Sequence, residues 1–410
     1  MVLTISFIVV IKMGKTDFKS FYIYAKAACP RRSLESTALF KYLVANGLLA
    51  VNHPKKADLI FVYTCGGFGQ DEAFSLLTIQ KALKASSGRV IVTGCLTKID
   101  PDVLKTYSNI LVIPPNELGQ LDSLINAKIP YSTVPRVSTV SGINDLYHGS
   151  LYSRLRRNIG LNDKLVKIII SSVMMKFFHK TDNIIVDPSF YRLEIAKGCL
   201  NNCSYCAIKC AMPKFHSHPQ NEVIQNFKNG LGAGYKNFVL IAGDTGCYGF
   251  DIGTSLPKLL EELFKVEGEY KIAIVDLNVR WLAKYYSDLL AILKSNSKKI
   301  FKIALPIQSG SNKILKLMHR NYEIDEVKRY LLDLKKSIPG ISIETHIMIG
   351  FPGETADDFS NSIQLVKEIQ FGRVDIYKYE ERPGTLALSL PEKVPRDQIN
   401  KRAKILKREI

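Results

Sequence analysis

Short apolar runs of strand length alternate with helical patterns along most of this 410-residue chain, and this alternation limits the possible folds most strongly. Strands rich in Val and Ile that alternate with helices predict a parallel sheet covered on both faces. The first series has strand patterns at residues 20–27, 58–64, 89–93 and 110–113, with helical patterns at 33–46 and 70–86. We therefore expect an amino-terminal α/β domain with a doubly wound parallel sheet.

A second series of strands begins near Tyr191. Its six strand patterns lie at residues 192–196, 237–241, 272–276, 301–306, 341–348 and 374–378. Six parallel strands with outer helices predict a partial (β/α)6 barrel, whose site would lie at the carboxyl ends of the strands. A chain of this length is too long to fold around a single hydrophobic core, so more than one domain is expected. We expect a first domain at 1–130, a basic linker with Arg154, Arg156 and Arg157 at 131–186, the barrel at 187–390 and a short tail at 391–410.

Each of the first three strands is followed closely by a cysteine. These cysteines are Cys29, Cys65 and Cys95. Because ligands of open parallel sheets bind beyond the carboxyl ends of the strands, the three side chains are expected to converge on one crevice. The alternative is that they are ordinary buried cysteines, which are common in protein cores.

Three further cysteines, Cys199, Cys203 and Cys206, follow the first strand of the second series. This spacing suits three irons of a four-iron, four-sulfur cluster and leaves the fourth iron without a protein ligand. Such an open iron can chelate the amino and carboxylate groups of S-adenosylmethionine (SAM) and pass one electron to its sulfonium, which releases a 5′-deoxyadenosyl radical. The alternative is a zinc site completed by Cys210, His216 or His218, although structural zinc normally uses paired motifs.

With these cysteines the sequence resembles the methylthiotransferases of the radical SAM superfamily over about residues 20–390. The amino-terminal segments that resemble the family lie at residues 29–36, 63–66 and 92–96, and those of the barrel at 242–251, 306–312, 348–355 and 382–385. The cysteine triplet alone indicates the superfamily. Its combination with three cysteines at upstream strand ends is typical of the methylthiotransferases.

The resemblance implies a second four-iron cluster held by Cys29, Cys65 and Cys95, whose open iron carries sulfur or a methylthio group. Two SAM molecules would then be used, one as methyl donor and one as radical source, and an unactivated C–H would become C–SCH3. The resemblance also implies an electron donor such as flavodoxin or ferredoxin, and a monomeric enzyme.

Two departures from the family pattern stand out. Arg31 and Arg32 occupy the region after the first cysteine where the family usually has Asn. Only about twenty residues follow Leu390, so we expect the carboxy-terminal β-barrel domain that binds substrate in many relatives to be absent or truncated.

Six other residues are candidates for contact with the cofactor. They are Tyr205, Gly243, Asp244, Gln308, Ser309 and Gly350. Tyr205 suits a place beside the adenine, and the others follow strands or lie in a glycine-rich turn where backbone can approach a ligand. Packing of Tyr205 and simple strand-end turns are the alternatives. We interpret Cys210 and Cys247 as ordinary cysteines and His346 as a core histidine.

The net charge is +18, from 56 Lys and Arg against 38 Asp and Glu, and a large positive field favours a polyanionic partner such as RNA. We therefore expect a tRNA adenosine as substrate, which residues 308–312 and 382–385 also favour. Residues 29–31 and 243–245 lean toward relatives that modify a ribosomal protein, and a ribosomally made peptide is a third option. An iron–sulfur protein that only binds RNA or senses redox state is the alternative from another class.

The longest apolar stretch, residues 3–11, is too short to span a bilayer and has no basic residue before it. Eight cysteines in 410 residues are too few for a disulfide scaffold. We therefore expect a cytoplasmic protein with reduced thiols and no membrane partner.

Overall fold

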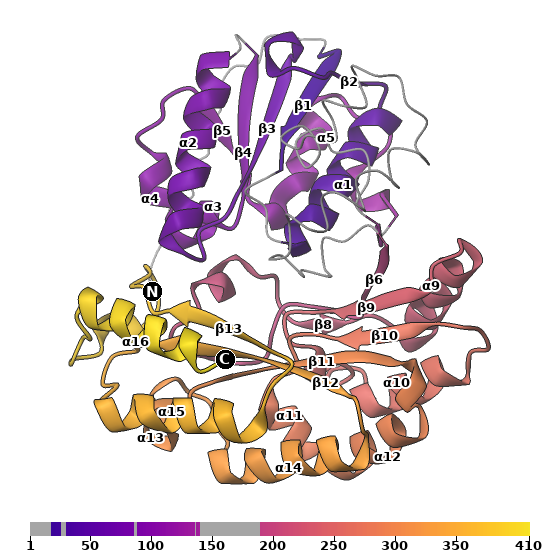
Figure 1. Ribbon diagram of the computed structural model, residues 1–410. Helices are drawn as coiled ribbons and strands as arrows, with labels where there is room; N and C mark the ends of the chain where they lie inside the picture. The colour runs from indigo at the N-terminus through magenta and orange to yellow at the C-terminus, as the bar shows by residue number, and fades with distance from the viewer. Residues whose placement is uncertain (1–17, 26–29, 86–87, 136, 140–188) are drawn as a thin grey trace, which may run out of the picture.

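The computed structural model describes residues 18–25, 30–85, 88–135, 137–139 and 189–410. These residues form two parallel sheets with helices on their faces, and Figure 1 shows the first sheet above the second. The expected α/β fold, a doubly wound sheet followed by a partial barrel, is confirmed. Cys29 and the basic run at Arg154, Arg156 and Arg157 lie outside the described residues.

The first sheet has the strand order β2-β1-β3-β4-β5, and all its pairings are parallel. Its strands are β1 (Ser20–Tyr24), β2 (Leu49–Ala50), β3 (Leu59–Thr64), β4 (Arg89–Gly94) and β5 (Ile110–Val112). Its helices are α1 (Pro30–Ala45), α2 (Gly69–Ala85), α3 (Leu96–Ile99), α4 (Pro101–Leu104) and α5 (Leu121–Leu124).

Alternate residues of these strands face opposite sides, so each face of the sheet is covered by its own helices. Phe61 on β3 packs in one core with Leu39 of α1, whereas Val62 packs in another with Ile79 of α2. In Figure 1, α1 and α2 accordingly lie on opposite sides of the sheet. The two-residue edge strand β2 was not predicted, because so short a run has no periodicity.

The second sheet has six parallel strands in the order β13-β12-β11-β10-β9-β6. Its strands are β6 (Phe190–Glu194), β9 (Asn237–Ile241), β10 (Lys271–Ile274), β11 (Ile300–Gln308), β12 (Ser342–Ile349) and β13 (Arg373–Lys378). The helices are α9 (Gln220–Gly232), α10 (Leu256–Lys265), α11 (Val279–Lys284), α12 (Tyr286–Ser295), α13 (Asn312–Leu317), α14 (Ile324–Ser337), α15 (Ala356–Ile369) and α16 (Arg396–Arg408). A two-stranded ribbon, β7 (Ala196–Lys197) with β8 (His216–Ser217), joins the segments before and after the cysteine triplet.

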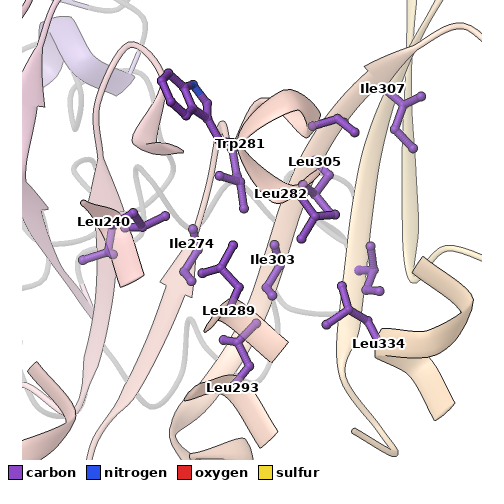
Figure 2. Packing of buried hydrophobic residues seen from close by; sticks show 14 of the residues in the cluster. Leu240, Ile274, Trp281, Leu282, Leu289, Leu293, Ile303, Leu305, Ile307 and Leu334 are labelled. Atoms are coloured by element: carbon purple, nitrogen blue, oxygen red, sulfur yellow. The ribbon is translucent and has the colours of Figure 1, made fainter. Parts of the chain in front are cut away.

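The largest core lies between the outer face of this sheet and the helices. Figure 2 shows strand residues such as Ile274 and Ile303 packed against Leu282 of α11 and Leu289 and Leu293 of α12. The intervening strand residues point inward, and they include Val239, Ile241, Ala273, Val275 and Ala304. These inward residues belong to the same core cluster as the first domain. The first domain therefore covers the open inner side of the partial barrel.

The ends of the second domain are also packed. Helix α16 lies beside β13 in Figure 1, and its Ile399 belongs to the barrel core. At the start of the expected linker, Tyr131 packs edge-on against Tyr42, and Arg192 donates its backbone N–H to the carbonyl of Ser138. The division at residues 130 and 186 stays a prediction. Among the described helices, none has the length and apolar character needed to cross a bilayer.

Candidate functional site

Cys65 and Cys95 lie side by side at the carboxyl edge of the first sheet. They follow β3 and β4, whose last residues Thr64 and Gly94 are paired in register, and the Cys95 N–H donates to the carbonyl of Thr64. Gly94 has a φ of +103° and leaves no room for a Cβ, which would lie 2.2 Å from that carbonyl oxygen. Both cysteines are buried and line the same cavity. The place of Cys29, the third predicted ligand, stays a prediction.

The second set of cysteines lies in the loop between β7 and the 3-10 turn at Ala207–Ala211. Cys199 Sγ accepts hydrogen bonds from the backbone N–H of Asn201 at 3.4 Å and from its side-chain Nδ2 at 3.3 Å. Cys203 Sγ accepts one from Arg320 Nη1 at 3.6 Å. Burial and the nearby Asp244 raise the pKa of the Cys199 thiol, while the Asn201 donors oppose this shift.

Arg320 is buried and contacts the triplet. Besides Cys203 it donates to Tyr322 Oη at 3.2 Å and to the carbonyl of Pro306. Burial alone would lower the pKa of Arg320, but contacts with Tyr322, Tyr205 and Cys203 raise it well above its usual value. Arg320 therefore supplies a permanent positive charge next to a predicted cluster ligand.

Asp244 is a buried hub beside the same loop. Its Oδ2 accepts from Asn201 Nδ2 at 2.6 Å and from Trp281 Nε1 at 2.8 Å. Its Oδ1 accepts from the backbone N–H groups of Asn278 at 3.1 Å and Gly246 at 3.0 Å. Burial raises the pKa of Asp244, and the four donors oppose that shift. The carboxylate thus fixes Asn201, which in turn holds the sulfur of Cys199.

Cys95 meets the loop that follows the triplet across the domain interface. Ala207, which follows Cys206 directly, packs with Ala211, Ile99 and Cys95 in one small buried cluster. Arg32 of α1 donates from Nε to Cys95 Sγ at 3.4 Å and from Nη2 to the carbonyl of Ala211 at 2.9 Å. It also pairs with Glu35. One buried side chain therefore ties Cys95 to the loop that follows the triplet.

A cavity of about 420 Å³ lies between the first domain and the inner face of the second sheet. Its wall combines Cys65 and Cys95 with backbone from the cluster loop and with barrel strands. At Gly243, an added Cβ would lie 2.0 Å from the carbonyl oxygen of Gly198, so only glycine fits there. The lining of the cavity includes Gly198, Gly243, Asp276, Lys302, Glu344, His346, Arg373 and Asp375.

The barrel strands contribute paired opposite charges to the wall of this cavity. Lys302 Nζ lies 2.8 and 2.9 Å from the two carboxylate oxygens of Glu344, and Arg373 Nε lies 2.9 Å from Asp375 Oδ1. His346, which sequence reasoning interpreted as a core residue, lines this wall with its Nε2 3.7 Å from Asp375. Burial lowers the pKa of His346, although Asp276 and Asp375 act in the opposite direction.

Of the six residues predicted to contact the cofactor, only Gly243 is among the residues that line this cavity. The ring of Tyr205 lies edge-on to Phe351, at a centroid distance of 6.4 Å, within an apolar cluster. Gly350 donates its N–H to Glu354 at 2.8 Å and packs against Ile399 of α16. Both residues therefore have structural roles here, and their contact with the cofactor stays a prediction.

Gln308 is the last residue of β11 and Ser309 follows it, and both are buried. Gln308 has a φ of +78°, uncommon for a residue with a side chain, and its Oε1 is buried without a hydrogen-bond partner among the described residues. Such a group is costly unless something binds it, and the contact of Gln308 and Ser309 with the cofactor stays a prediction.

The other two cysteines differ from the six predicted ligands. Cys210 is exposed, and Cys247 is buried and donates to the carbonyl of Asp244 at 3.0 Å. Burial raises the pKa of Cys247 far above its ordinary value, because the thiolate would be desolvated.

The thiols of Cys199, Cys203 and Cys206 fit the ligand set of a four-iron cluster. Among the described side chains, no three His, Cys, Asp or Glu residues surround a point where one ion could be held. Each thiolate of a four-iron cluster binds a different iron, so three cluster ligands need not surround one point. Hydrogen bonds from N–H groups to Cys199, Cys203 and Cys95 are the contacts that tune cluster sulfurs.

Sequence reasoning missed the charged wall. Charged residues lie on three barrel strands, with Lys302 on β11, Glu344 on β12, and Arg373 and Asp375 on β13. Alternate positions of a barrel strand face the interior. This alternation could have predicted that the charged side chains face the interior of the barrel. Arg32 was noticed only as a departure from a family pattern, because its contact with the carbonyl of Ala211 joins residues 179 positions apart.

Comparisons with known proteins agree with the two-domain organisation. The model of the Radical SAM superfamily matches residues 193–366, and that of Uncharacterized protein family UPF0004 matches residues 22–113. A probable threonylcarbamoyladenosine tRNA methylthiotransferase of Pyrococcus abyssi is 31% identical over 382 residues, which cover 93% of this chain and 81% of the relative. A ribosomal protein uS12 methylthiotransferase (RimO) of Syntrophomonas wolfei is 28% identical and covers 90% of this chain and 78% of its own.

Among solved structures, the radical SAM methyltransferase TsrM from Kitasatospora setae has a TM-score of 0.59 at 12% identity. The match covers 90% of this chain and 76% of that one. At this identity the similarity concerns the fold alone.

Proposed function

The chain belongs to the radical SAM methylthiotransferase family, and from this premise we propose that it methylthiolates an adenosine of tRNA with two iron–sulfur clusters. As a radical SAM enzyme it uses SAM and a four-iron cluster. The contact of Cys95 with the loop that follows the triplet, through Arg32 and through packing on Ala207, carries the two-cluster proposal. A radical formed at one site must be quenched by sulfur held close by.

The cysteines divide into two ligand sets. Cys199, Cys203 and Cys206 would hold the cluster that binds SAM, and Cys29, Cys65 and Cys95 would hold the second. When bound, the clusters supply reductive cleavage of one SAM and a sulfur that a second SAM has methylated. Asn201 and Arg320 orient the first ligand set by donating to its sulfurs. Arg32 does the same for Cys95.

The cavity between the domains is the proposed place for the reacting base. Cys65 and Cys95 line one side and Gly243, next to the triplet loop, lines another, so a substrate there would reach both sites. The charged wall of Lys302, Glu344, Arg373 and Asp375 offers both signs of charge to a polar modified base. These side chains would position the base, and the covering first domain would exclude water from the radical.

Two observations favour tRNA as the substrate. The net charge of +18 attracts a polyanion. The relatives of Pyrococcus abyssi and Pyrococcus horikoshii are described as probable threonylcarbamoyladenosine tRNA methylthiotransferases. The same reaction on a ribosomal protein is the second candidate, because relatives named for uS12 are nearly as similar.

Release of 5′-deoxyadenosine separates an enzyme from a protein that only carries clusters. We expect the reconstituted, dithionite-reduced protein to release it from SAM under anaerobic conditions. In a variant with Cys199, Cys203 and Cys206 all replaced by Ala, the release of 5′-deoxyadenosine should fall to background. Chromatography with mass detection measures the product. If the unsubstituted, cluster-loaded protein releases none, the chain is an iron–sulfur binding protein and the proposed reaction is wrong.

A further inference from the structure

A second cavity, of about 470 Å³, lies outside the proposed substrate site and beside the cluster loop. It is lined by Leu200, Phe250, Arg280, Trp281 and Lys284. Leu200 follows Cys199 directly, so the cavity reaches the loop of the triplet. None of these residues lines the cavity between the domains. We call these five residues the Trp281 surface.

The Trp281 surface combines exposed apolar groups with cations. The side chain of Phe250 is 60% exposed, and that of Ile252, two residues further along the chain, is 43% exposed. The Arg280 guanidinium lies 4.5 Å from the Trp281 ring centroid, and Lys284 Nζ lies 5.3 Å from it. Arg280 Nε is buried without a hydrogen-bond partner among the described residues. The aromatic faces therefore hold these charges in place, and within the described residues no carboxylate pairs with them.

A continuous chain of hydrogen bonds joins this surface to the triplet. Trp281 Nε1 donates to Asp244 Oδ2 at 2.8 Å, and Asn201 Nδ2 donates to the same oxygen at 2.6 Å. The Asn201 amide also donates to Cys199 Sγ at 3.3 Å. Figure 2 shows the Trp281 indole at the rim of the barrel core, while Leu282 of the same helix points into it. The surface thus lies three hydrogen bonds from a cluster ligand.

We propose that the Trp281 surface docks an acidic flavoprotein that supplies the electrons for SAM cleavage. An exposed aromatic anchor with cations at its rim suits a partner of negative potential, because charge complementarity steers association. The anionic flavin hydroquinone loses one electron and becomes the neutral semiquinone. The cluster gains that electron and is reduced by one unit. The inference rests on the cluster proposed at Cys199, Cys203 and Cys206.

RNA is the competing occupant, since phosphates and stacked bases also favour cations and aromatic rings. The location argues against it. A tRNA base must enter the cavity between the domains, with which the Trp281 surface shares no lining residue. An electron donor needs only proximity to the cluster, which the hydrogen bonds from Trp281 to Cys199 provide.

The test compares two reductants on the reconstituted protein. Arg280→Glu and Lys284→Glu reverse the surface charges, and Phe250→Ser removes the apolar anchor. We expect cluster bleaching by an acidic flavodoxin in its hydroquinone form to slow by about tenfold in each charge variant, with a similar loss of affinity for the oxidised flavodoxin in calorimetry. Bleaching by dithionite, which needs no docking, should stay within about twofold of the unsubstituted protein.

Lys404→Glu is the matched control. Lys404 is exposed on α16, at the β13 edge of the sheet, and its reversal should leave both rates unchanged. Equal flavodoxin rates and affinities in all variants would overturn the proposal, as would a loss of tRNA affinity without a change in flavodoxin binding. If dithionite does not reduce a cluster in the unsubstituted protein, the cluster assignment fails, while calorimetry still decides whether the surface binds the flavoprotein.

Discussion

Joint replacement of Cys29, Cys65 and Cys95 by Ala is expected to leave a protein that cleaves SAM but transfers no methylthio group. Each four-iron cluster contributes about four irons, so iron content should fall from about eight to about four per chain. Cys65 and Cys95 lie at adjacent strand ends in the first domain, whereas the triplet loop is supported by Asn201 and Arg320 from the second. Loss of one ligand set therefore leaves the other intact.

Iron analysis, 5′-deoxyadenosine release and methylthio transfer measured on the same preparation check this prediction. Cys210→Ala is the control, because Cys210 is exposed and lies outside both ligand sets. It should keep the full iron content and both activities. An unchanged iron content in the triple variant would show that the upstream cysteines are not ligands. Loss of SAM cleavage together with sulfur transfer would contradict the independence of the two sites.

Replacing Asp244 by Ala is expected to cost about 4 kcal/mol of unfolding free energy, because buried donors lose a charged acceptor. The substitution would leave four buried donors without their acceptor, namely Trp281 Nε1, Asn201 Nδ2 and the backbone N–H groups of Asn278 and Gly246. Asp244→Asn should not restore the stability, because both carboxylate oxygens accept hydrogen bonds and the NH2 group of Asn would face donors at one of these positions. The released Asn201 no longer orients the Cys199 sulfur, so 5′-deoxyadenosine formation should fall even where the variant stays folded.

Denaturant unfolding and dithionite-driven SAM cleavage measure the two effects. Asp251→Ala is the matched control: Asp251 accepts from the Ser217 N–H at 2.9 Å but is exposed, so its loss should cost roughly 1 kcal/mol or less. Equal unfolding free energies for the two variants would contradict the role of Asp244 as a buried hub. Full SAM cleavage by a folded Asp244→Ala protein would contradict its link to Cys199.

Much of the fold was predictable because strands and helices leave local patterns. The six strands of the partial barrel and the four longer strands of the first sheet all lie where their apolar runs indicated. Cys65 and Cys95 were expected to converge because they follow strands that lie parallel in one sheet, and the structure brings them together. Cys29 shares that position in the sequence but lies outside the described residues.

The rest depended on contacts between distant residues, which leave no local pattern. Asp244 was assigned to the cofactor from its place after a strand, whereas its four donors come from segments up to 43 positions away. Arg32 joins two domains, and neither its burial nor its contact with Cys95 follows from helix periodicity. His346 and the paired charges beside it line a cavity that exists only because the first domain covers the barrel.

The most direct test of the proposed reaction is the mass of the nucleosides of tRNA after incubation with the reconstituted protein, SAM and a reductant. We expect an adenosine derivative to gain one methylthio group, with 5′-deoxyadenosine released alongside it and no gain when the upstream cysteines are replaced by Ala. Release of 5′-deoxyadenosine with unmodified tRNA, and a methylthio group on a ribosomal protein or peptide offered in parallel, would contradict the account of tRNA as the substrate.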